Sequence, residues 1–361
     1  MKQLCLQMNI ISSLTQEAIE LLQSLIQKHS LSKQENETAD ILKNYLQKYS
    51  IDVQMLQNNV WVKNKYFVED KPTILLNSHH DTVPANKGYT KNPLDSSIED
   101  GKLFGLGSND AGGSLVSLLA TFLYFFSKEN LNYNLIFAAT AEEEISGENG
   151  IELLYPQLGR IDVAIVGEPT QMQMAVAEKG LLVIDCVVKG KAGHAAREEG
   201  DNAIYKAMSA IDWFKNYQFQ KISDSLGPVK MSVTIINAGM QHNMVPDVCT
   251  FTVDIRINEL YTHEEILRVI EENVNAEILP RSMRMKSSGI SVSHPLVQSG
   301  QKLGRTMYGS PTTSDKALMS CPSLKMGPGD SARSHSADEF IYVNEIKDGI
   351  DLYIKLLENI L

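Results

Sequence analysis

The stretch Ile74-Leu75-Leu76-Asn77-Ser78-His79-His80-Asp81 decides the fold class, because an apolar run leads directly into metal-ligating residue types. Short apolar runs separated by helical segments are typical of strands buried on both faces of an α/β sheet. In such sheets, ligands bind beyond the carboxyl ends of the strands. Two further runs end in the same way: Leu135 to Thr140 leads into Glu142-Glu143-Glu144, and Val163 to Val166 leads into Gly167-Glu168-Pro169.

The length of 361 residues favours two domains, since single cores rarely exceed roughly 250–300 residues. We expect an α/β catalytic domain with a mixed sheet in two segments, residues 1–177 and 291–361, and an inserted α+β domain at 178–290. The insert has the β-α-β-β-α-β order of a ferredoxin-like fold. Its expected elements are a strand at 181–188, a helix at 202–214, strands at 231–236 and 248–257, a helix at 263–274 and a strand near Met283.

Composition excludes several classes of protein. A formal net charge of −11 and a pI of about 5.3 argue against a nucleic-acid partner, which requires clustered Lys and Arg. The longest apolar stretch, residues 115–126, is too short to cross a bilayer, so no membrane association is expected. Scattered cysteines without a C-x-x-C pair, and an N-terminus without the features of a signal peptide, predict a reducing, cytoplasmic location.

Each polar group has a plainer alternative when taken alone. His79 and Asp81 could be a surface-loop pair, and Glu142-Glu143-Glu144 could be a solvated acidic turn. Asp110, in the glycine-rich segment 105–113, could cap the helix that follows it. Against these alternatives, a carboxylate two residues from a histidine can orient a metal-bound imidazole. Three adjacent carboxylates after a buried strand also repel one another unless a cation lies nearby.

Taken together and in order, these motifs resemble the M20 family of metallopeptidases and deacylases. The resemblance covers nearly the whole chain and is strongest to the acetylornithine deacetylase group, with succinyl-diaminopimelate desuccinylase also similar. It adds Gly193-His194 and the late His335 to the motifs above. It implies a zinc-peptidase-like catalytic domain whose inserted domain serves as a lid and dimerisation surface. It also implies a cis peptide bond between Asp110 and Ala111.

The resemblance implies two divalent ions, with Zn²⁺ expected and Co²⁺ as the alternative; carboxylates and imidazoles without thiolates suit both metals. Two such ions can polarise a carbonyl group and lower the pKa of a shared water. The resemblance implies that His79 and Glu168 bind one ion, that Glu144 and His335 bind the other, and that Asp110 bridges both. It also implies that Asp81 orients His79 and that Glu143 is the general base.

Four further residues are implied outside the metal cluster. His194 is expected to stabilise an oxyanion, from the neighbouring subunit of a homodimer or, alternatively, from its own. Asn243 and Arg256 are expected to bind the substrate, because the planar fork of an arginine suits a carboxylate. A plain ion pair with Asp254 is the alternative for Arg256. Gly327 is expected to shape the pocket.

The expected activity is removal of an acetyl or succinyl group from an amino acid such as ornithine or citrulline, in arginine biosynthesis. The substrate would be a small N-acyl amino acid. The alternatives are a metal-dependent dipeptidase or aminopeptidase of the same family, and a non-catalytic metal-binding protein. An intact Glu143 beside five expected ligands argues against metal storage, which needs no general base.

Overall fold

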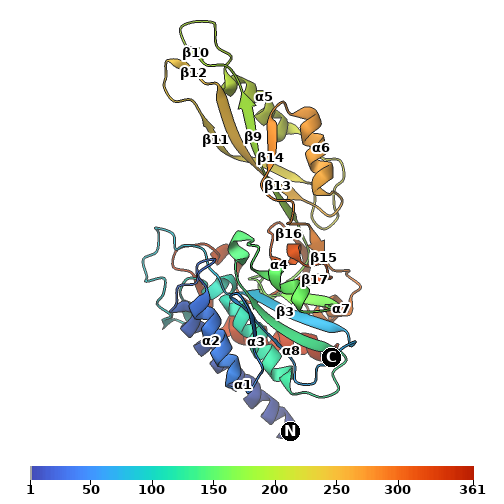
Figure 1. Cartoon of the computed structure of the whole chain (residues 1–361). Helices are drawn as coiled ribbons and strands as arrows, with labels where there is room; N and C mark the ends of the chain where they lie inside the picture. Colours follow the sequence, from blue (N-terminus) through green and yellow to red (C-terminus); the bar gives the residue numbers. More distant parts are fainter. Residues whose placement is uncertain (1) are drawn as a thin grey trace. The chain divides into compact units, whose positions relative to one another are not determined.

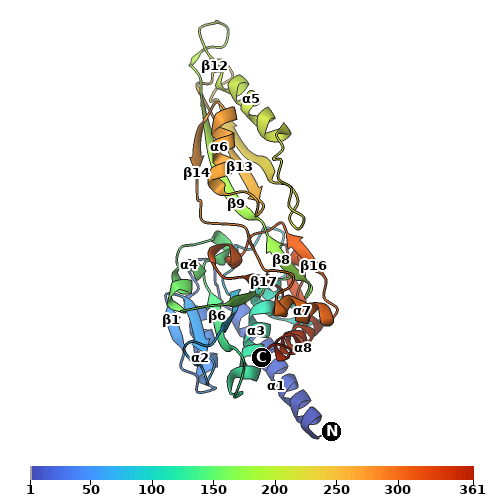
Figure 2. The same ribbon diagram turned by 90° about the vertical axis from the view of Figure 1, so that its right-hand side faces the viewer.

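A computed structural model describes the backbone of residues 2–361 and the side chains from residue 9 onward. The chain divides into two compact units (Figures 1 and 2). The first comprises Met1–Val176, Gly289–Tyr308 and Ser314–Leu361, and the second comprises Ala177–Ser288 and Gly309–Thr313. Within residues 2–361, no helix is both long enough and apolar enough to span a membrane.

A mixed sheet forms the centre of the first unit, as predicted. Strands β6, β3, β7 and β17 run parallel to one another, while β2 pairs antiparallel with β6 and β8 pairs antiparallel with β17. The order across the sheet is β1 (Gln54–Leu56), β2 (Asn59–Lys63), β6 (Asn134–Thr140), β3 (Thr73–His79), β7 (Val163–Val166), β17 (Ser323–Lys325), β8 (Met174–Glu178) and β15 (Ser288–Gly289), with β16 (Met307–Ser310) also paired to β8.

Both faces of this sheet are covered, which explains the continuous apolar runs. Successive side chains of a strand point to opposite faces. Ile74 and Leu76 therefore join one core, and Leu75 joins another. Helices α1 (Lys2–Ile26), α3 (Gly113–Phe126) and α8 (Val343–Glu358) pack together over the first face (Figure 1). The short α4 (Ile151–Leu154) and the turn η3 (Tyr155–Gln157) contribute to the core on the second face.

The remaining elements of the first unit lie around this sandwich. Helix α2 (Asn36–Gln47) packs on α1 and β2, and α7 (Pro295–Lys302) packs on α8. A small antiparallel sheet has the order β18 (Phe340–Tyr342), β5 (Lys102–Phe104) and β4 (Ile98–Glu99). It matters for the site because Glu339, immediately before β18, accepts a backbone hydrogen bond from Gly105.

The second unit has the predicted ferredoxin-like order. Its antiparallel sheet runs β11 (Lys230–Ala238), β13 (Val248–Ile257), β9 (Gly180–Lys189), β14 (Glu277–Pro280). Helices α5 (Ala203–Asn216) and α6 (His263–Asn273) share one apolar core with this sheet. The strand expected near Met283 was misplaced, because pairing with β9 involves residues 277–280. A separate ribbon joins β10 (Gly193–His194) to β12 (Met244–Val245).

The second unit also contains residues 309–313, which lie far from 177–288 in the sequence. The backbone N–H of Lys179 donates to the Ser310 carbonyl at 3.1 Å, and the Thr313 hydroxyl donates to the Lys179 carbonyl at 3.3 Å. These long-range hydrogen bonds attach the segment to the second unit. Only the folded chain brings these positions together.

Candidate metal centre

The carboxyl ends of three neighbouring parallel strands bring the predicted residues of the first unit together. His79 ends β3 and pairs in register with Thr140, the last residue of β6. Glu143 and Glu144 follow in a single 3₁₀ turn, η2 (Glu143–Ile145). Glu168 lies two residues beyond β7, which is the other neighbour of β3. The ends of adjacent strands thus deliver one imidazole and three carboxylates to one place.

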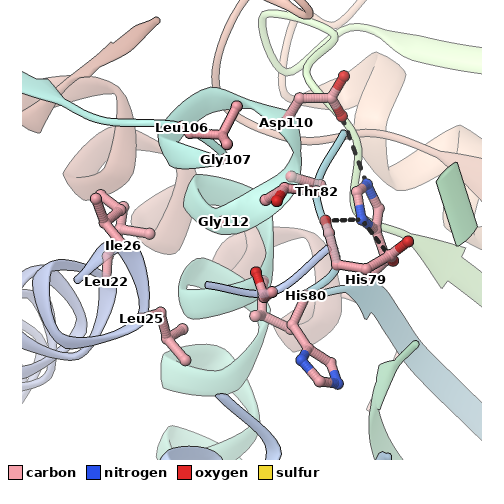
Figure 3. Close-up of a pocket in the computed structure, with 14 residues that line it drawn as sticks. Leu22, Leu25, Ile26, His79, His80, Thr82, Leu106, Gly107, Asp110 and Gly112 are labelled. Atoms are coloured by element: carbon pink, nitrogen blue, oxygen red, sulfur yellow. Dashed lines mark hydrogen bonds and ion pairs between the residues drawn. The ribbon is translucent and has the colours of Figure 1, made fainter. Parts of the chain in front are cut away.

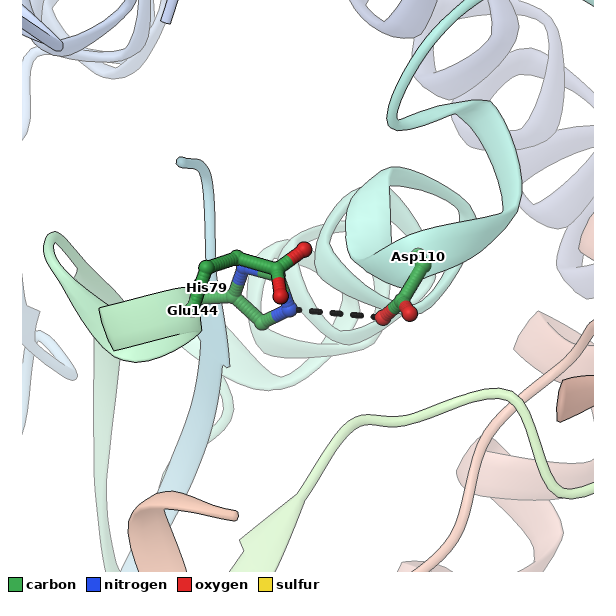
Figure 4. Close-up of side chains that lie close together, drawn as sticks. All are labelled: His79, Asp110 and Glu144. Atoms are coloured by element: carbon green, nitrogen blue, oxygen red, sulfur yellow. Dashed lines mark ion pairs between the residues drawn. The ribbon is translucent and has the colours of Figure 1, made fainter. Parts of the chain in front are cut away.

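The two ring nitrogens of the buried His79 have different surroundings. Nδ1 is 3.0 Å from the backbone oxygen of Asp81 and 3.3 Å from its Oδ1. Since both neighbours are acceptors, Nδ1 carries the hydrogen in the neutral ring, and the lone pair of Nε2 is left to bind a cation. Nε2 is buried without a hydrogen-bond partner among the described residues, and Asp110 Oδ1 lies 3.5 Å away (Figure 4).

Asp110 lies between the two histidines. Its Oδ1 faces His79, and its Oδ2 is 3.7 Å from Nε2 of His335. His335 Nε2 is in turn 3.0 Å from Oε2 of Glu144. One carboxylate therefore has an oxygen toward each of two potential ligand groups. This arrangement suits a carboxylate shared by two ions.

Asp110 occupies an irregular turn and does not cap the helix that follows. It lies in the distorted turn η1 (Ser108–Gly112) with φ −118° and ψ 98°, and α3 begins after Gly112 without a side-chain cap. The helix-cap alternative is therefore wrong. The Asp110–Ala111 peptide bond is cis, which confirms that expectation.

Asp81 connects the strand end to the acidic turn. Its Oδ1 accepts the backbone N–H of Glu143 at 3.0 Å, and its Oδ2 accepts the N–H of Glu144 at 3.1 Å. The hydroxyl of Ser32 also donates to Oδ2 at 2.7 Å. The carboxylate that lies beside His79 thus also fixes the backbone that carries Glu143 and Glu144.

The carboxylates crowd around His79 and perturb one another. Burial raises the pKa of Glu143 well above its usual value, and neighbouring Glu168 adds to the shift. Burial likewise raises the pKa of Glu168 to about 8. Burial alone would lower the pKa of His79, but the negative charges of Glu143 and Asp110 raise it overall. A concentration of buried negative charge is stabilised by cations.

The edge toward His335 is more open. The hydrogen bond to Glu144 raises the pKa of His335 to about 9, and the His335 side chain is 55% exposed. Although burial opposes ionisation of Asp110, the neighbouring His79 lowers the Asp110 pKa overall. The donor set therefore has one buried imidazole and one accessible imidazole on either side of Asp110.

Ligand atoms near His79 fall into two overlapping groups that could each hold an ion: His79, Asp110 and Glu144, and His79, Glu143 and Glu168. Both consist of oxygens and imidazole nitrogen, the ligands of Zn²⁺ and related divalent metals. His79 belongs to both groups, and its Nε2 is the atom nearest Asp110, Glu143 and Glu168. These residues therefore fit a divalent metal.

A small cavity of about 20 Å³ lies behind His79 (Figure 3). Leu22, Leu25 and Ile26 of α1 line one side, and the segments 79–82 and 106–112 line the other. This apolar wall limits solvent access to the site from the helical layer.

Sequence reasoning missed three side chains that surround the cluster. Glu339 accepts backbone hydrogen bonds from the turn that carries Asp110. Asn109 makes a two-point contact with the backbone of Asp330 at 3.0 Å each. Asp315 accepts hydrogen bonds from Asn77 and Thr140, and burial raises its pKa to about 6. Each of these contacts joins residues at least 175 positions apart, so no local pattern in the sequence could have indicated it.

Gly327 lies where the backbone approaches the strand end closely. A Cβ atom there would be 2.2 Å from Ser114 Oγ and 2.5 Å from the Glu168 backbone oxygen. Any side chain would therefore displace the segment that carries Glu168. Gly327 keeps this contact open and lies beside the metal cluster, within the first unit.

The other predicted residues, His194, Asn243 and Arg256, belong to the second unit. His194 is exposed, on β10, and its Nδ1 accepts the backbone N–H of Ala196 at 3.1 Å. The Asn243 carbonyl accepts the N–H of Ala195 at 3.0 Å, so His194 and Asn243 share one ribbon. Arg256 makes a two-point contact with Asp254, at 2.8 and 3.0 Å, and its Nη1 donates to Thr313.

Histidines and carboxylates that converge at the carboxyl ends of parallel strands define a metal-dependent hydrolase of amide bonds, as the comparisons also indicate. The chain belongs to peptidase family M20/M25/M40, whose model matches residues 75–359. It is 24% identical over 371 residues to a succinyl-diaminopimelate desuccinylase of Wolbachia pipientis wMel, covering 95% of this chain and 93% of that protein. It is 28% identical over 315 residues to an acetylornithine deacetylase of Proteus mirabilis, covering 79% of each chain.

Solved structures share the fold. An M20 family metallo-carboxypeptidase from Sulfolobus solfataricus aligns with a TM-score of 0.77 at 19% identity, over 96% of this chain and 100% of that one. A dinuclear metal-binding M20 peptidase of Bacillus subtilis aligns with a TM-score of 0.71 at 17% identity, over 96% of this chain and 98% of that one. The mixed α/β architecture is thus confirmed.

The electrostatics predict how the metal-free protein responds to pH. Glu168 has its pKa raised from 4.5 to about 8, and His335 from 6.5 to about 9, so the folded protein holds protons that the unfolded chain has released. These two groups lower the stability as pH rises between about 4.5 and 9. Burial lowers the pKa of His80 to about 4, which opposes this trend below about pH 6.5. We expect the melting temperature of chelator-treated protein to drop between about pH 6 and pH 8.5.

Two controls accompany this measurement. Glu168→Gln should make the decline shallower below about pH 8, because it removes one of the groups whose pKa is raised in the folded protein. Added Zn²⁺ should stabilise more at high pH, since ligands must be deprotonated to bind. A metal-free melting temperature that stays level or rises across this range would contradict the assigned shifts.

Proposed function

We propose that this chain hydrolyses the amide bond of an N-acyl amino acid, using two divalent ions held in the first unit. The observation that carries the proposal is Asp110, with one oxygen toward His79 and the other toward His335, whose Nε2 also contacts Glu144. The relatives named as a desuccinylase and a deacetylase support an N-acyl amino acid as the substrate class.

In this proposal His79 and Glu168 would hold one ion, Glu144 and His335 would hold the other, and Asp110 would be shared by both. The 3.0 Å separation between His335 and Glu144 supports their assignment to the same ion. Asp81 orients His79 through Nδ1. Zn²⁺ is the proposed metal and Co²⁺ the alternative, since the donors are oxygen and imidazole only.

The bound ions would polarise the scissile carbonyl group and acidify a water molecule. Glu143 is proposed as the general base that accepts a proton from this water and delivers it to the departing amine. Its carboxylate lies 3.9 Å from His79 Nε2, and Asp81 holds its backbone N–H. Burial raises the pKa of Glu143, which suits a group that must accept a proton and then release it.

Substrate recognition is proposed to involve the second unit. Asp254 binds the Nε and Nη2 edge of Arg256 and leaves Nη1 facing Thr313, so the guanidinium is held in a defined orientation. Arg256 could bind a carboxylate through its remaining N–H groups. Asn243 and His194 lie on the paired ribbon, where His194 Nε2 would donate to the oxyanion. Gly327 is proposed to shape the pocket by allowing the close approach of the segment that carries Glu168.

A homodimer through the second unit is also proposed. Strand β11 is a terminal strand of its sheet, and Ile235 and Ile236 on it are 48% and 53% exposed. Adjacent α5 exposes Tyr205 and Met208 by 71% and 61%. An edge strand with exposed apolar side chains is a common site for pairing with another chain. A place in arginine biosynthesis and a cytoplasmic location stay predictions.

The first test is a substrate panel. N-acetyl and N-succinyl amino acids, including derivatives of ornithine and citrulline, are compared with dipeptides using protein loaded with Zn²⁺ or Co²⁺. We expect release of the acyl group, about two ions per chain, and loss of activity with chelator. Turnover of dipeptides alone would favour the peptidase alternative. Metal binding without turnover of any substrate would favour a non-catalytic protein.

The second test separates the general base from the ligand. Glu143→Ala should lower turnover by about 10²–10⁴-fold or more while leaving metal content nearly unchanged. Glu144→Ala should instead weaken binding of the second ion, because Glu144 faces His335. The measurements are kcat and metal content on the same preparations. Equal metal loss in both variants would show that the two roles are wrongly assigned.

The third test asks whether His194 acts across a dimer. His194→Ala and Glu143→Ala chains, each inactive, are mixed after reversible dissociation. Half of the randomly formed dimers are mixed, and each mixed dimer has one site with both groups intact. About a quarter of wild-type activity should return, because catalytic groups act only when assembled in one site. Confirmed subunit exchange without recovered activity would exclude action in trans.

A further inference from the structure

Glu339 is a buried carboxylate to which none of the roles above applies. It is 2% exposed. Its Oε1 accepts the backbone N–H of Asn109 at 2.8 Å and that of Asp110 at 2.9 Å, and its Oε2 accepts the N–H of Gly107 at 3.1 Å. One side chain thus receives three backbone hydrogen bonds from the turn that carries Asp110.

The backbone of Glu339 is itself firmly placed. Its carbonyl accepts the N–H of Gly105 at 2.9 Å, and the next residue, Phe340, begins β18 and pairs with Phe104 of β5. The carboxylate therefore extends from a fixed strand end to the turn η1. The pairing of β18 with β5 therefore fixes both the chain that leads into η1 and the backbone of Glu339, whose carboxylate binds η1.

The turn needs such a group because its own backbone cannot satisfy these N–H groups. Asp110 has non-helical dihedral angles, so the regular hydrogen bonds of a helix do not begin until after η1. Gly107 has φ +75°, and a Cβ atom there would be 2.6 Å from Thr82. Buried N–H groups left without an acceptor cost free energy comparable to a lost hydrogen bond.

Glu339 also connects the two proposed ligands. It lies four residues after His335, and Asn109 is bonded to the backbone of Asp330 on the other side of His335. The segment 330–339 and the turn 107–110 are thus joined at both ends of the loop that carries His335. A carboxylate can accept all three of the N–H groups of the turn, whereas an amide offers only one acceptor oxygen.

We infer that Glu339 is a positioning residue for the dinuclear site: it fixes Asp110 between the two ions and links the Asp110 turn to the His335 segment. This inference rests on the proposed function, because it assumes that Asp110 bridges two ions. Side chains that orient metal ligands typically contribute about 10- to 100-fold to metal affinity. A bridging ligand should transmit that loss to both ions, not to one.

The test is Glu339→Gln, which keeps the shape but replaces one acceptor oxygen with an NH₂ group. With the amide oxygen toward Asn109 and Asp110, the NH₂ group would face the Gly107 N–H, and two donors would oppose each other. We expect both dissociation constants for Zn²⁺, measured by chelator competition, to rise about 10-fold or more. The visible absorption of the Co²⁺-loaded protein should also change, and kcat should fall more than KM rises.

Asp162→Asn is the matched control. Asp162 accepts the backbone N–H of Thr73 at 2.9 Å, at the start of β3 in the same unit and at the opposite end of that strand from His79. Its loss removes a carboxylate bonded to the backbone without touching the site. It should lower the melting temperature of the metal-free protein without altering either dissociation constant or the Co²⁺ spectrum.

The outcomes are distinguishable. If the wild-type chain binds no divalent ions, the proposed function fails. If the wild-type chain binds two ions and folded Glu339→Gln binds both with unchanged affinity, only the role of Glu339 is overturned. If the variant does not fold, hydrogen exchange in the metal-free wild type decides. Slow exchange at Gly107, Asn109 and Asp110 is expected, and exchange as fast as in an open loop would overturn the inference.

Discussion

Burying several carboxylates around one histidine is the constraint on which the rest of this structure depends. Glu143, Glu168 and Asp110 lie within 4 Å of Nε2 of His79, which has no hydrogen-bond partner in the part of the chain that the structure describes. Such a cluster is costly unless cations balance it. The surrounding structure can therefore be understood as the support that holds these side chains together despite their repulsion.

That support has two layers. Parallel strands β6, β3 and β7 end side by side and bring their following residues to one edge. Around them, single carboxylates bind backbone N–H groups of the ligand-bearing turns, as Asp81 does for Glu143 and Glu144. Glu339 does the same for the Asp110 turn. Backbone N–H groups act as the fixed partners because they cannot rotate away.

Much of the candidate site could be predicted because the signal is local. An apolar run followed by His79 or Glu168 identifies both the strand and the end at which its side chains converge. Interactions between distant segments could not be predicted in this way. Glu339 reaches Gly107 across 232 positions in the sequence, and Asp315 reaches Asn77 across 238. The strand predicted near Met283 was misplaced for a similar reason. The position of β14 depends on its pairing with β9, which lies far away in the sequence.

The sequence by itself determined the α/β class, the β-α-β-β-α-β order of the second unit, and the residues beyond each strand. These features follow from hydrophobic patterning along a few consecutive residues. Only the tertiary structure decided that Glu339 binds the turn that carries Asp110, and that residues 309–313 belong to the second unit. Those facts depend on which distant segments pack together, and packing is a property of the folded chain and not of any local pattern.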